Sequence, residues 1–244
     1  MKPFRKIDSP IGRLIAIGDI HACCKELEAL LGFLKAERGL SSEDLVVFMG
    51  DYIDRGSDAA GVIKMLLQFQ QEFPSTVFLK GNHEDMLLDH LGFEGNQGSV
   101  FIVNGGAATL ASYGISASES SDQVALKMPT SHLGFLLNLD SYVMVDKFVF
   151  AHAGLHPLKP LDGQKSRDLF WIREEFIGNI HPFEITVVFG HTPYKNVLFN
   201  LPYKIGIDTG LVYGNMLSCV DFTSKEIVQV RLGTTKITVR GFPS

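Results

Sequence analysis

Gly50-Asp51-Tyr52-Ile53-Asp54-Arg55-Gly56 is the stretch that decides the fold, and it follows the apolar run Leu45-Val46-Val47-Phe48-Met49. The β-branched and aromatic content of that run predicts a buried strand. A strand that ends in Gly-Asp places its carboxylate beyond the edge of the sheet. Asp51 and Asp54 repel each other unless cations lie beside them, and Arg55 offsets only part of their charge. In isolation this pattern is typical of a surface loop with an ion pair, but here it recurs along the chain.

The composition is typical of a globular protein. The chain has 244 residues, 45% hydrophobic and 20% charged, which suits one large or two small domains. The net charge is −5 and no basic stripe is present, so nucleic-acid binding has no electrostatic support. No apolar run approaches a membrane span of about 18 residues, and no secretory signal is recognisable. Three cysteines, an odd number, argue against a disulfide framework. We therefore expect a cytoplasmic protein without nucleic-acid or membrane partners. The sequence has no heptad pattern, so it gives no indication of the oligomeric state.

Strands and helices alternate over the first 90 residues. The periodicity predicts strands at 14–17, 45–49 and 76–79, helices at 23–38 and 57–73, and a short helix after 83. This alternation indicates βαβ units and a parallel sheet. Further apolar runs predict strands at 148–150, 186–189 and 205–207, and the tail predicts three short strands near 217–222, 226–232 and 236–241.

Residues 92–142 differ from this pattern because they are rich in Gly, Ser and Ala. We interpret them as a helical insert that shapes one wall of the site, with short helices around 100–112 and 131–138 and an exposed turn at 116–121. No linker divides the chain. We therefore expect one α/β domain over 1–244, with two sheets packed face to face and helices outside them.

Five of the predicted strands end in residues of one chemical kind. They are followed by Asp19 and His21, by Asp51 and Asp54, by Asn82 and His83, by His152, and by His191. Ligand sites in open α/β sheets lie beyond the carboxyl ends of the strands. A single histidine after a strand is usually structural, but four at equivalent ends indicate a shared site. The pair Cys23-Cys24 follows His21 closely, and we interpret it as packing at a helix start.

Imidazole, carboxylate and amide oxygen, without thiolate, form a ligand set that suits Mn²⁺, Fe or Zn²⁺. One ion does not need so many ligands, whereas two ions bridged by a carboxylate would use them all. Water bound to such a pair becomes a nucleophile near neutral pH, and Arg55 can clamp phosphoryl oxygens in bidentate geometry. The residues therefore point to phosphoryl-transfer chemistry.

The motifs Gly18-Asp19-Ile20-His21, Gly50–Gly56, Gly81-Asn82-His83-Glu84, His152-Ala153-Gly154 and Gly190-His191-Thr192 appear in this order. Together they resemble the PPP-type metallophosphatases, the serine/threonine phosphatases that include phage lambda phosphatase and bacterial relatives of protein phosphatase 1. Ile207-Asp208-Thr209-Gly210 extends a bacterial-type pattern toward residue 220. The resemblance implies a metallo-dependent phosphatase fold, in which helices flank a central β-sandwich of two mixed sheets.

The resemblance also implies a role for each motif residue. The first metal would be held by Asp19, His21 and Asp51, and the second by Asp51, Asn82, His152 and His191. Mn²⁺ is the expected ion, with Fe or Zn²⁺ as alternatives. His83 would be the general acid, and Asp54 would orient its imidazole. The substrate phosphate would be bound by Arg55, Asn82 and Arg173. The role of Arg173 is inferred only from the short pattern Trp171-Ile172-Arg173, and the alternative is that Arg173 is a cation on the surface of a helix.

One position departs from the family pattern, because Ala22 stands where the first motif commonly has glycine. A positive φ at this position would strain alanine. We expect instead that Ala22 already belongs to the first turn of the helix, where alanine causes no strain.

Three functions are compatible with these motifs. The first is a phosphomonoesterase that hydrolyses phosphoserine and phosphothreonine in proteins by attack of a metal-bridging hydroxide. The second is a symmetrical dinucleoside-tetraphosphate hydrolase of the same superfamily. Those enzymes commonly lack the acid corresponding to Asp54 and carry Asp in place of Glu84. The third is a non-catalytic phospho-ligand-binding module, which predicts loss of a ligand or of the acid, whereas all are present here.

Overall fold

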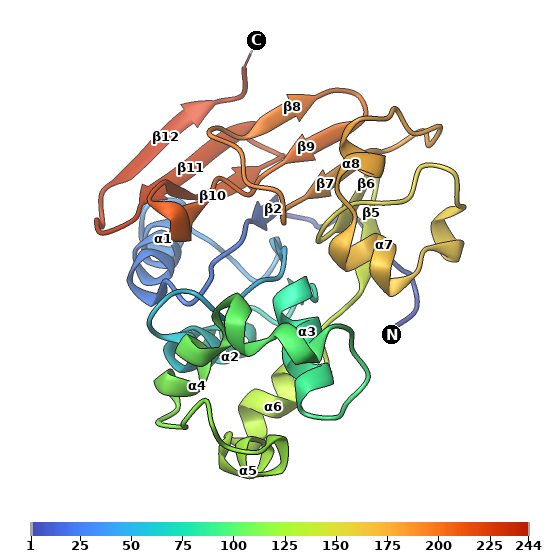
Figure 1. The fold of residues 1–244 in the computed structure, drawn as a ribbon. Coiled ribbons are helices and arrows are strands. Elements are labelled where there is room, and N and C mark those ends of the chain that lie inside the picture. The colour runs from blue at the N-terminus through green and yellow to red at the C-terminus, as the bar shows by residue number, and fades with distance from the viewer. Residues whose placement is uncertain (1, 244) are drawn as a thin grey trace.

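Two six-stranded mixed sheets pack face to face in the computed structural model, which describes residues 2–243 (Figure 1). The first sheet runs in the order β12 (Ile237–Gly241), β11 (Glu226–Arg231), β10 (Met216–Asp221), β2 (Leu14–Ile17), β3 (Leu45–Phe48) and β4 (Val77–Phe78). The second runs in the order β1 (Arg5–Ile7), β5 (Tyr142–Val145), β6 (Phe148–Ala151), β7 (Thr186–Phe189), β9 (Lys204–Gly206) and β8 (Leu198–Asn200).

The pairing confirms the predicted change from parallel to antiparallel structure. β2, β3 and β4 pair in parallel, as the βαβ alternation predicted, and β10, β11 and β12 pair antiparallel. β10 joins the two parts by pairing antiparallel with β2, where Cys219 lies opposite Ile17. The tail therefore completes the same sheet that the first 90 residues begin.

Alternate residues of the central strands face two different cores, which is why strands such as β2 and β3 are apolar throughout. In β2, Leu14 and Ala16 belong to the core between the sheets, whereas Ile15 and Ile17 belong to the core under the helices. The outer face of the second sheet buries Val149 and Phe189 in a third core. The predicted four-layer arrangement, with two sheets between two layers of helices, is confirmed.

Helices α1 (Cys24–Ala36) and α2 (Ala59–Glu72) cover the first sheet. Asp58 caps α2, because its carboxylate accepts a hydrogen bond of 2.8 Å from the Gly61 N–H. On the other side, α7 (Ser166–Trp171) and α8 (Glu174–Ile177) cover the second sheet (Figure 1). The short helix η3 (Leu161–Gly163) precedes α7, and η4 (Leu211–Tyr213) precedes β10.

The predicted helical insert forms a lobe below the sheets in Figure 1. After α3 (Asn82–His90), it contains η1 (Gly98–Val100), the π-helix η2 (Ile102–Gly106), α4 (Ala107–Ser112), α5 (Ser121–Lys127) and α6 (Thr130–Leu137). Its residues Leu110, Val124 and Leu136 pack in the same core as α1 and α2.

The sequence predictions missed several short elements. Among them, β1, β5, β8, α5, α7 and α8 were not predicted, although the expected turn at 116–121 leads into α5. α5 has seven residues and buries only Val124, so it carries too little periodicity to be recognised. β1 and β8 are three-residue strands at the two edges of their sheet, without a buried apolar run.

Within residues 2–243, no helix is long and apolar enough to cross a membrane. Cys23, Cys24 and Cys219 are free thiols. The expectation that the chain has no disulfide framework is therefore confirmed.

Candidate metal centre and active site

The loops that follow β2, β3, β4, β6 and β7 bring the predicted side chains together. Hydrogen bonds and ion-pair contacts join all ten into one network: Asp19, His21, Asp51, Asp54, Arg55, Asn82, His83, His152, Arg173 and His191. Within each sheet the carboxyl ends of the parallel strands lie at one rim, and the network joins the rims of the two sheets. The geometric expectation is met, although the role of each residue stays a prediction.

Asp51 lies at the centre of this network and is 2% exposed. One carboxylate oxygen is 3.5 Å from His21 Nε2, and the other is 3.4 Å from His152 Nε2. The second oxygen also accepts a hydrogen bond of 3.1 Å from the His83 N–H. Burial alone would raise the pKa of Asp51, but the surrounding imidazoles of His152, His83 and His21 lower it below its usual value. Asp51 is therefore ionised and shared between two sides of the site.

The ring protons of two histidines point away from the centre. His21 Nδ1 lies 3.0 Å from the Ile53 carbonyl, and His152 Nδ1 lies 2.7 Å from the Met49 carbonyl. Since a carbonyl oxygen only accepts, both Nδ1 atoms carry the proton. Burial lowers the pKa of both imidazoles, that of His21 to about 3, so both rings are neutral. Their Nε2 lone pairs therefore face the centre, an arrangement that metal-ligating histidines adopt.

This arrangement places several hydrogen-bond acceptor atoms opposite one another without a proton between them. His152 Nε2 is 3.1 Å from Asn82 Oδ1 and 3.4 Å from the Asp51 carboxylate, and none of these atoms carries a proton to share. Asp19 Oδ1 is buried and has no hydrogen-bond partner. Burial and the nearby carboxylates of Asp208 and Asp51 raise the pKa of Asp19 well above its usual value. Converging buried lone pairs of this kind fit a cation, so the residues present suit a divalent metal.

Two triads of described residues have ligand atoms within 4.8 Å of one another. They are His21 with Asp51 and His83, and Asp51 with His152 and His191. Asp51 belongs to both, as a bridging carboxylate would. Asp19 belongs to neither triad, and its other oxygen accepts a hydrogen bond of 2.9 Å from the His191 N–H.

His83, which belongs to the first triad, also forms a buried pair with Asp54. His83 Nδ1 lies 2.6 Å from Asp54 Oδ2, and the two side chains are 1% and 0% exposed. His83 Nε2 has no partner. Burial would lower the pKa of His83, but the charge of Asp51 and the hydrogen bond to Asp54 outweigh it and raise the pKa. The imidazole is therefore disposed to hold a proton with one nitrogen free.

Two arginines point toward the same centre. Arg55 Nη1 donates to His21 Nε2 at 2.8 Å, and Arg173 Nε donates to His191 Nε2 at 3.1 Å. Arg55 also lies over the ring of Tyr213, 5.4 Å from its centroid. Arg173, although exposed, therefore contacts the predicted site, and its phosphate-binding role stays a prediction.

Strained backbone is concentrated around the centre. φ is positive at His21 (47°), Asp51 (53°) and His191 (63°), a region that costs non-glycine residues roughly 1–2 kcal/mol. Ala22 also has a φ of 56°, and α1 begins only at Cys24, so the expectation that Ala22 lies in the first helical turn is wrong. Its N–H donates to the Tyr52 carbonyl at 2.8 Å, which helps to hold the strained turn.

Glycines let the loops approach closely. A Cβ on Gly81 would lie 2.2 Å from an Asp51 oxygen, and a Cβ on Gly190 would lie 2.1 Å from an Asp19 oxygen. Any side chain at these two positions would push a carboxylate out of the centre. This is the physical reason for the glycines that precede Asn82 and His191 in their motifs.

Glu84 has a structural role that its place in the motif Gly81-Asn82-His83-Glu84 did not indicate. Glu84 is fully buried, and its carboxylate accepts hydrogen bonds from the N–H groups of Gly81, Asp51, Tyr52 and Ile53 at 2.8–3.3 Å. Burial, then the charge of Asp51, raises its pKa to about 7. It holds together the loops after β3 and β4.

Two further residues of the site, Asp208 and Thr109, were not predicted from the sequence. Asp208 follows β9, lies near Asp19 and is 6% exposed, and the strand-end rule could have found it. Thr109 of α4 is fully buried and hydrogen-bonds to Asp54 at 2.5 Å. No pattern in the insert signalled this contact, because it joins positions 55 residues apart.

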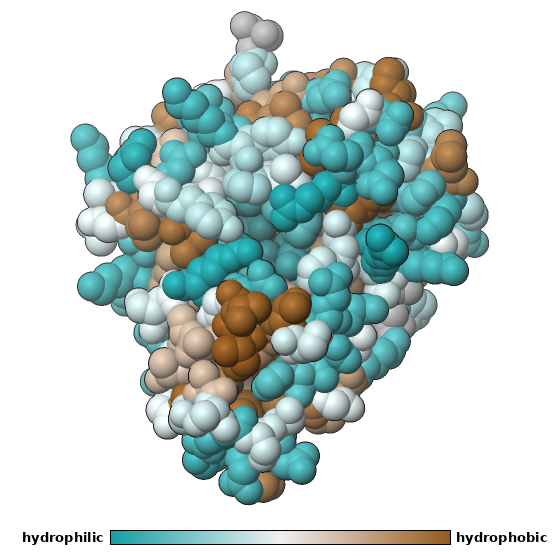
Figure 2. Space-filling model, in the orientation of Figure 1, coloured by the Kyte–Doolittle hydropathy of each residue, from teal (hydrophilic) through white to brown (hydrophobic). Residues whose placement is uncertain are grey.

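Figure 2 shows a hollow lined by hydrophilic residues between the sheets and the helical lobe, with an apolar patch directly below it, over the segment that precedes α4. Val103 of η2 is 83% exposed in this segment.

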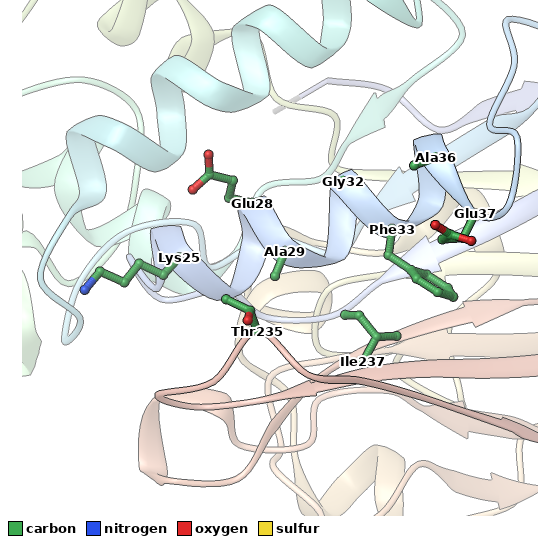
Figure 3. Close-up of a pocket in the computed structure, with 9 residues that line it drawn as sticks. All are labelled: Lys25, Glu28, Ala29, Gly32, Phe33, Ala36, Glu37, Thr235 and Ile237. Atoms are coloured by element: carbon green, nitrogen blue, oxygen red, sulfur yellow. The ribbon is translucent and has the colours of Figure 1, made fainter.

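A separate groove of about 670 Å³ lies between α1 and β12, where Phe33 and Ile237 face each other (Figure 3). That groove contains none of the motif residues, so we place the functional site at the network around Asp51.

With this geometry, comparison with known proteins defines the class. The chain belongs to the calcineurin-like phosphoesterase family, whose profile matches residues 12–214. It is a metallophosphoesterase, a hydrolase whose histidine and aspartate clusters can bind metal ions.

Relatives within this class carry two kinds of name. The bis(5′-nucleosyl)-tetraphosphatase PrpE (asymmetrical) of Oceanobacillus iheyensis is 30% identical over 234 residues, which cover 88% of this chain and 90% of that protein. Serine/threonine-protein phosphatase 1 of Salmonella typhimurium is 31% identical over 210 residues, which cover 83% of this chain and 88% of that protein. A crystal structure that carries the name of a candidate diadenosine tetraphosphatase superposes on this chain with a TM-score of 0.71 at 25% sequence identity. The superposition covers 95% of this chain and 99% of that chain.

Proposed function

We propose that this chain is a dinuclear-metal phosphomonoesterase that acts on phosphoserine and phosphothreonine in proteins. The observation that carries the proposal is the buried pair of His83 and Asp54, 2.6 Å apart, with the second imidazole nitrogen free. This pair has the arrangement of a general acid held by an orienting carboxylate.

The chemistry of the leaving group connects that pair to a substrate class. A phosphoserine ester expels a serine alkoxide, which is strongly basic and needs a proton as the P–O bond breaks. A dinucleoside tetraphosphate expels a nucleotide, whose phosphate has a pKa of about 6 and leaves without a donated proton. A complete acid pair is therefore of most use on a phosphoserine or phosphothreonine ester.

Each residue then has a role that its position supports. Divalent ions, with Mn²⁺ as the expected ion, would be held by six residues and would supply Lewis-acid activation of water. These residues are Asp19, His21, Asp51, Asn82, His152 and His191. Arg55 and Arg173 bind the phosphoryl oxygens with their guanidinium groups. His83 donates a proton from Nε2 to the departing serine oxygen, and Asp54 keeps the ring oriented.

A second candidate is a dinucleoside-tetraphosphate hydrolase. It is supported by the PrpE relative, which matches most of both chains. That relative is named asymmetrical, whereas the sequence motifs suggested the symmetrical type. The presence of Asp54 and Glu84 favours the phosphatase over this candidate.

Purified, metal-loaded protein incubated with a phosphoserine peptide and with diadenosine tetraphosphate separates the two candidates. We expect a higher kcat/KM for the peptide, and much faster turnover of the dinucleotide would overturn the proposal. We also expect His83→Asn to lower kcat on the peptide by about 10²-fold or more while metal content is kept, because only the proton donor is removed. An unchanged kcat would exclude His83 as the acid.

A further inference from the structure

Two successive site residues are held in a conformation that they do not favour. Asp54 has a φ of 69° and Arg55 a φ of 70°. For residues with a Cβ, each such conformation costs roughly 1–2 kcal/mol, and it persists only when surrounding contacts fix it. The pair that orients the general acid and binds the phosphate is therefore strained, and something outside the motif must hold it.

The contacts that hold it come from the helical insert. Thr109 Oγ1 accepts a hydrogen bond of 2.8 Å from the Asp54 N–H and donates one of 2.5 Å to Asp54 Oδ1. A hydroxyl has one proton and two lone pairs, so Thr109 can make both bonds at once. The second oxygen, Asp54 Oδ2, remains for His83 Nδ1. Thr109 thus fixes both the backbone and the carboxylate of Asp54.

The same segment also fixes Arg55. The Gly105 carbonyl, in the π-helix η2, accepts a hydrogen bond of 3.3 Å from the Arg55 N–H. Gly105 has a φ of 112°, and a Cβ there would lie 2.8 Å from both Arg55 N and Cγ. This φ lies outside the helical region, so the chain is kinked at Gly105. Here the turn brings a bare backbone against Arg55, four residues before Thr109.

We propose that residues 105–109 of the insert form a clamp on the Asp54–Arg55 pair, in which Thr109 is a positioning residue for the general acid. The inference rests on the proposed function, because it needs His83 to donate a proton. Without the Thr109 hydroxyl, the Asp54 carboxylate can turn away from the imidazole, and His83 loses its orientation. The loss then falls on substrates that need the proton, while phosphate binding by Arg55 is kept.

The test compares three variants on two substrates. Thr109→Val removes the hydroxyl at nearly constant shape, Thr109→Ser keeps it, and Ser112→Ala removes a neighbouring hydroxyl of α4 that bonds to the Ala60 N–H and the Thr109 carbonyl. The substrates are a phosphoserine peptide and p-nitrophenyl phosphate, whose weakly basic leaving group needs no proton.

We expect Thr109→Val to lower kcat on the peptide by about tenfold or more, with KM unchanged, and to lower kcat on p-nitrophenyl phosphate by less than about threefold. Thr109→Ser and Ser112→Ala should stay within about threefold of the wild type on both substrates. Proton NMR of the metal-free protein gives a readout without turnover. The low-field Nδ1 proton of His83 should shift or broaden in Thr109→Val and remain in the other two variants.

Equal losses on both substrates, or a kcat for Thr109→Val on the peptide within about twofold of the wild type, would overturn the clamp. His83→Asn distinguishes this failure from failure of the proposed function. If His83→Asn is selective for the peptide and Thr109→Val is not, the acid is correct and the clamp is wrong. If His83→Asn shows no selectivity, the proposed function itself fails.

Discussion

Glu84 offers the sharpest test of how the site is built, because one carboxylate organises the loops after β3 and β4. One oxygen accepts from the N–H groups of Asp51 and Gly81, both at 2.9 Å, and the other accepts from those of Tyr52 and Ile53 at 2.8 and 3.3 Å. The perturbation is Glu84→Gln. Glutamine has one acceptor oxygen, so its NH₂ group faces two N–H donors and leaves both unpaired in a fully buried position.

The magnitude follows from that count. Each unpaired buried donor costs about 1–3 kcal/mol, so we expect Glu84→Gln to lower the free energy of unfolding by about 4 kcal/mol. For a chain of this size, about 2–4 °C of Tm is lost per kcal/mol, which corresponds to a fall of about 8–16 °C.

The assay is urea and thermal unfolding followed by circular dichroism. It is made in chelator, so that metal binding does not contribute, and at pH 8, above the Glu84 pKa of about 7. Glu72→Gln is the matched control, since its side chain is 53% exposed and should change stability by less than about 0.5 kcal/mol. If Glu84→Gln unfolds within about 1 kcal/mol of the wild type, the four hydrogen bonds do not hold the loops and the reasoning is refuted.

Two further predictions concern the metal centre and the first sheet. Asp51→Asn should lose both bound metal and activity, because the carboxylate common to both triads becomes a neutral amide, and full metal content by elemental analysis would contradict a bridging role. Asp44→Asn should lower the free energy of unfolding by about 2 kcal/mol at pH 7, because the Asp44 carboxylate accepts from Arg13 Nη2 at 2.7 Å and from the Arg13 N–H at 2.6 Å. Burial would raise the pKa of Asp44, but these bonds lower it below 3.8, so its stabilisation is complete above the unfolded pKa and is lost as the pH falls through the folded pKa. In urea titrations the difference between wild type and Asp44→Asn should therefore narrow as the pH falls below about 4, and a constant difference would show that the ion pair is not its source.

The sequence by itself determined the strand ends and the ligand chemistry. Strands of four apolar residues, such as 14–17 and 45–48, are recognisable because burial on both faces requires continuous hydrophobicity. Parallel pairing then places the carboxyl ends of β2, β3 and β4 at one rim of the first sheet, and those of β6 and β7 at one rim of the second. Local pattern was sufficient for each rim, but the packing of the two sheets decided that Asp51 and His152 meet.

Only the tertiary structure decided how the strained loops are held. Ala22 was expected in a helix, yet its φ is positive because the Tyr52 carbonyl and the start of α1 constrain it. Thr109 and Gly105 reach Asp54 and Arg55 across 50 or more positions, from an insert without clear periodicity. Such contacts depend on one side chain or carbonyl meeting a particular partner after the cores have packed. Periodicity records which faces are buried, but it carries no information on which polar group ends beside which.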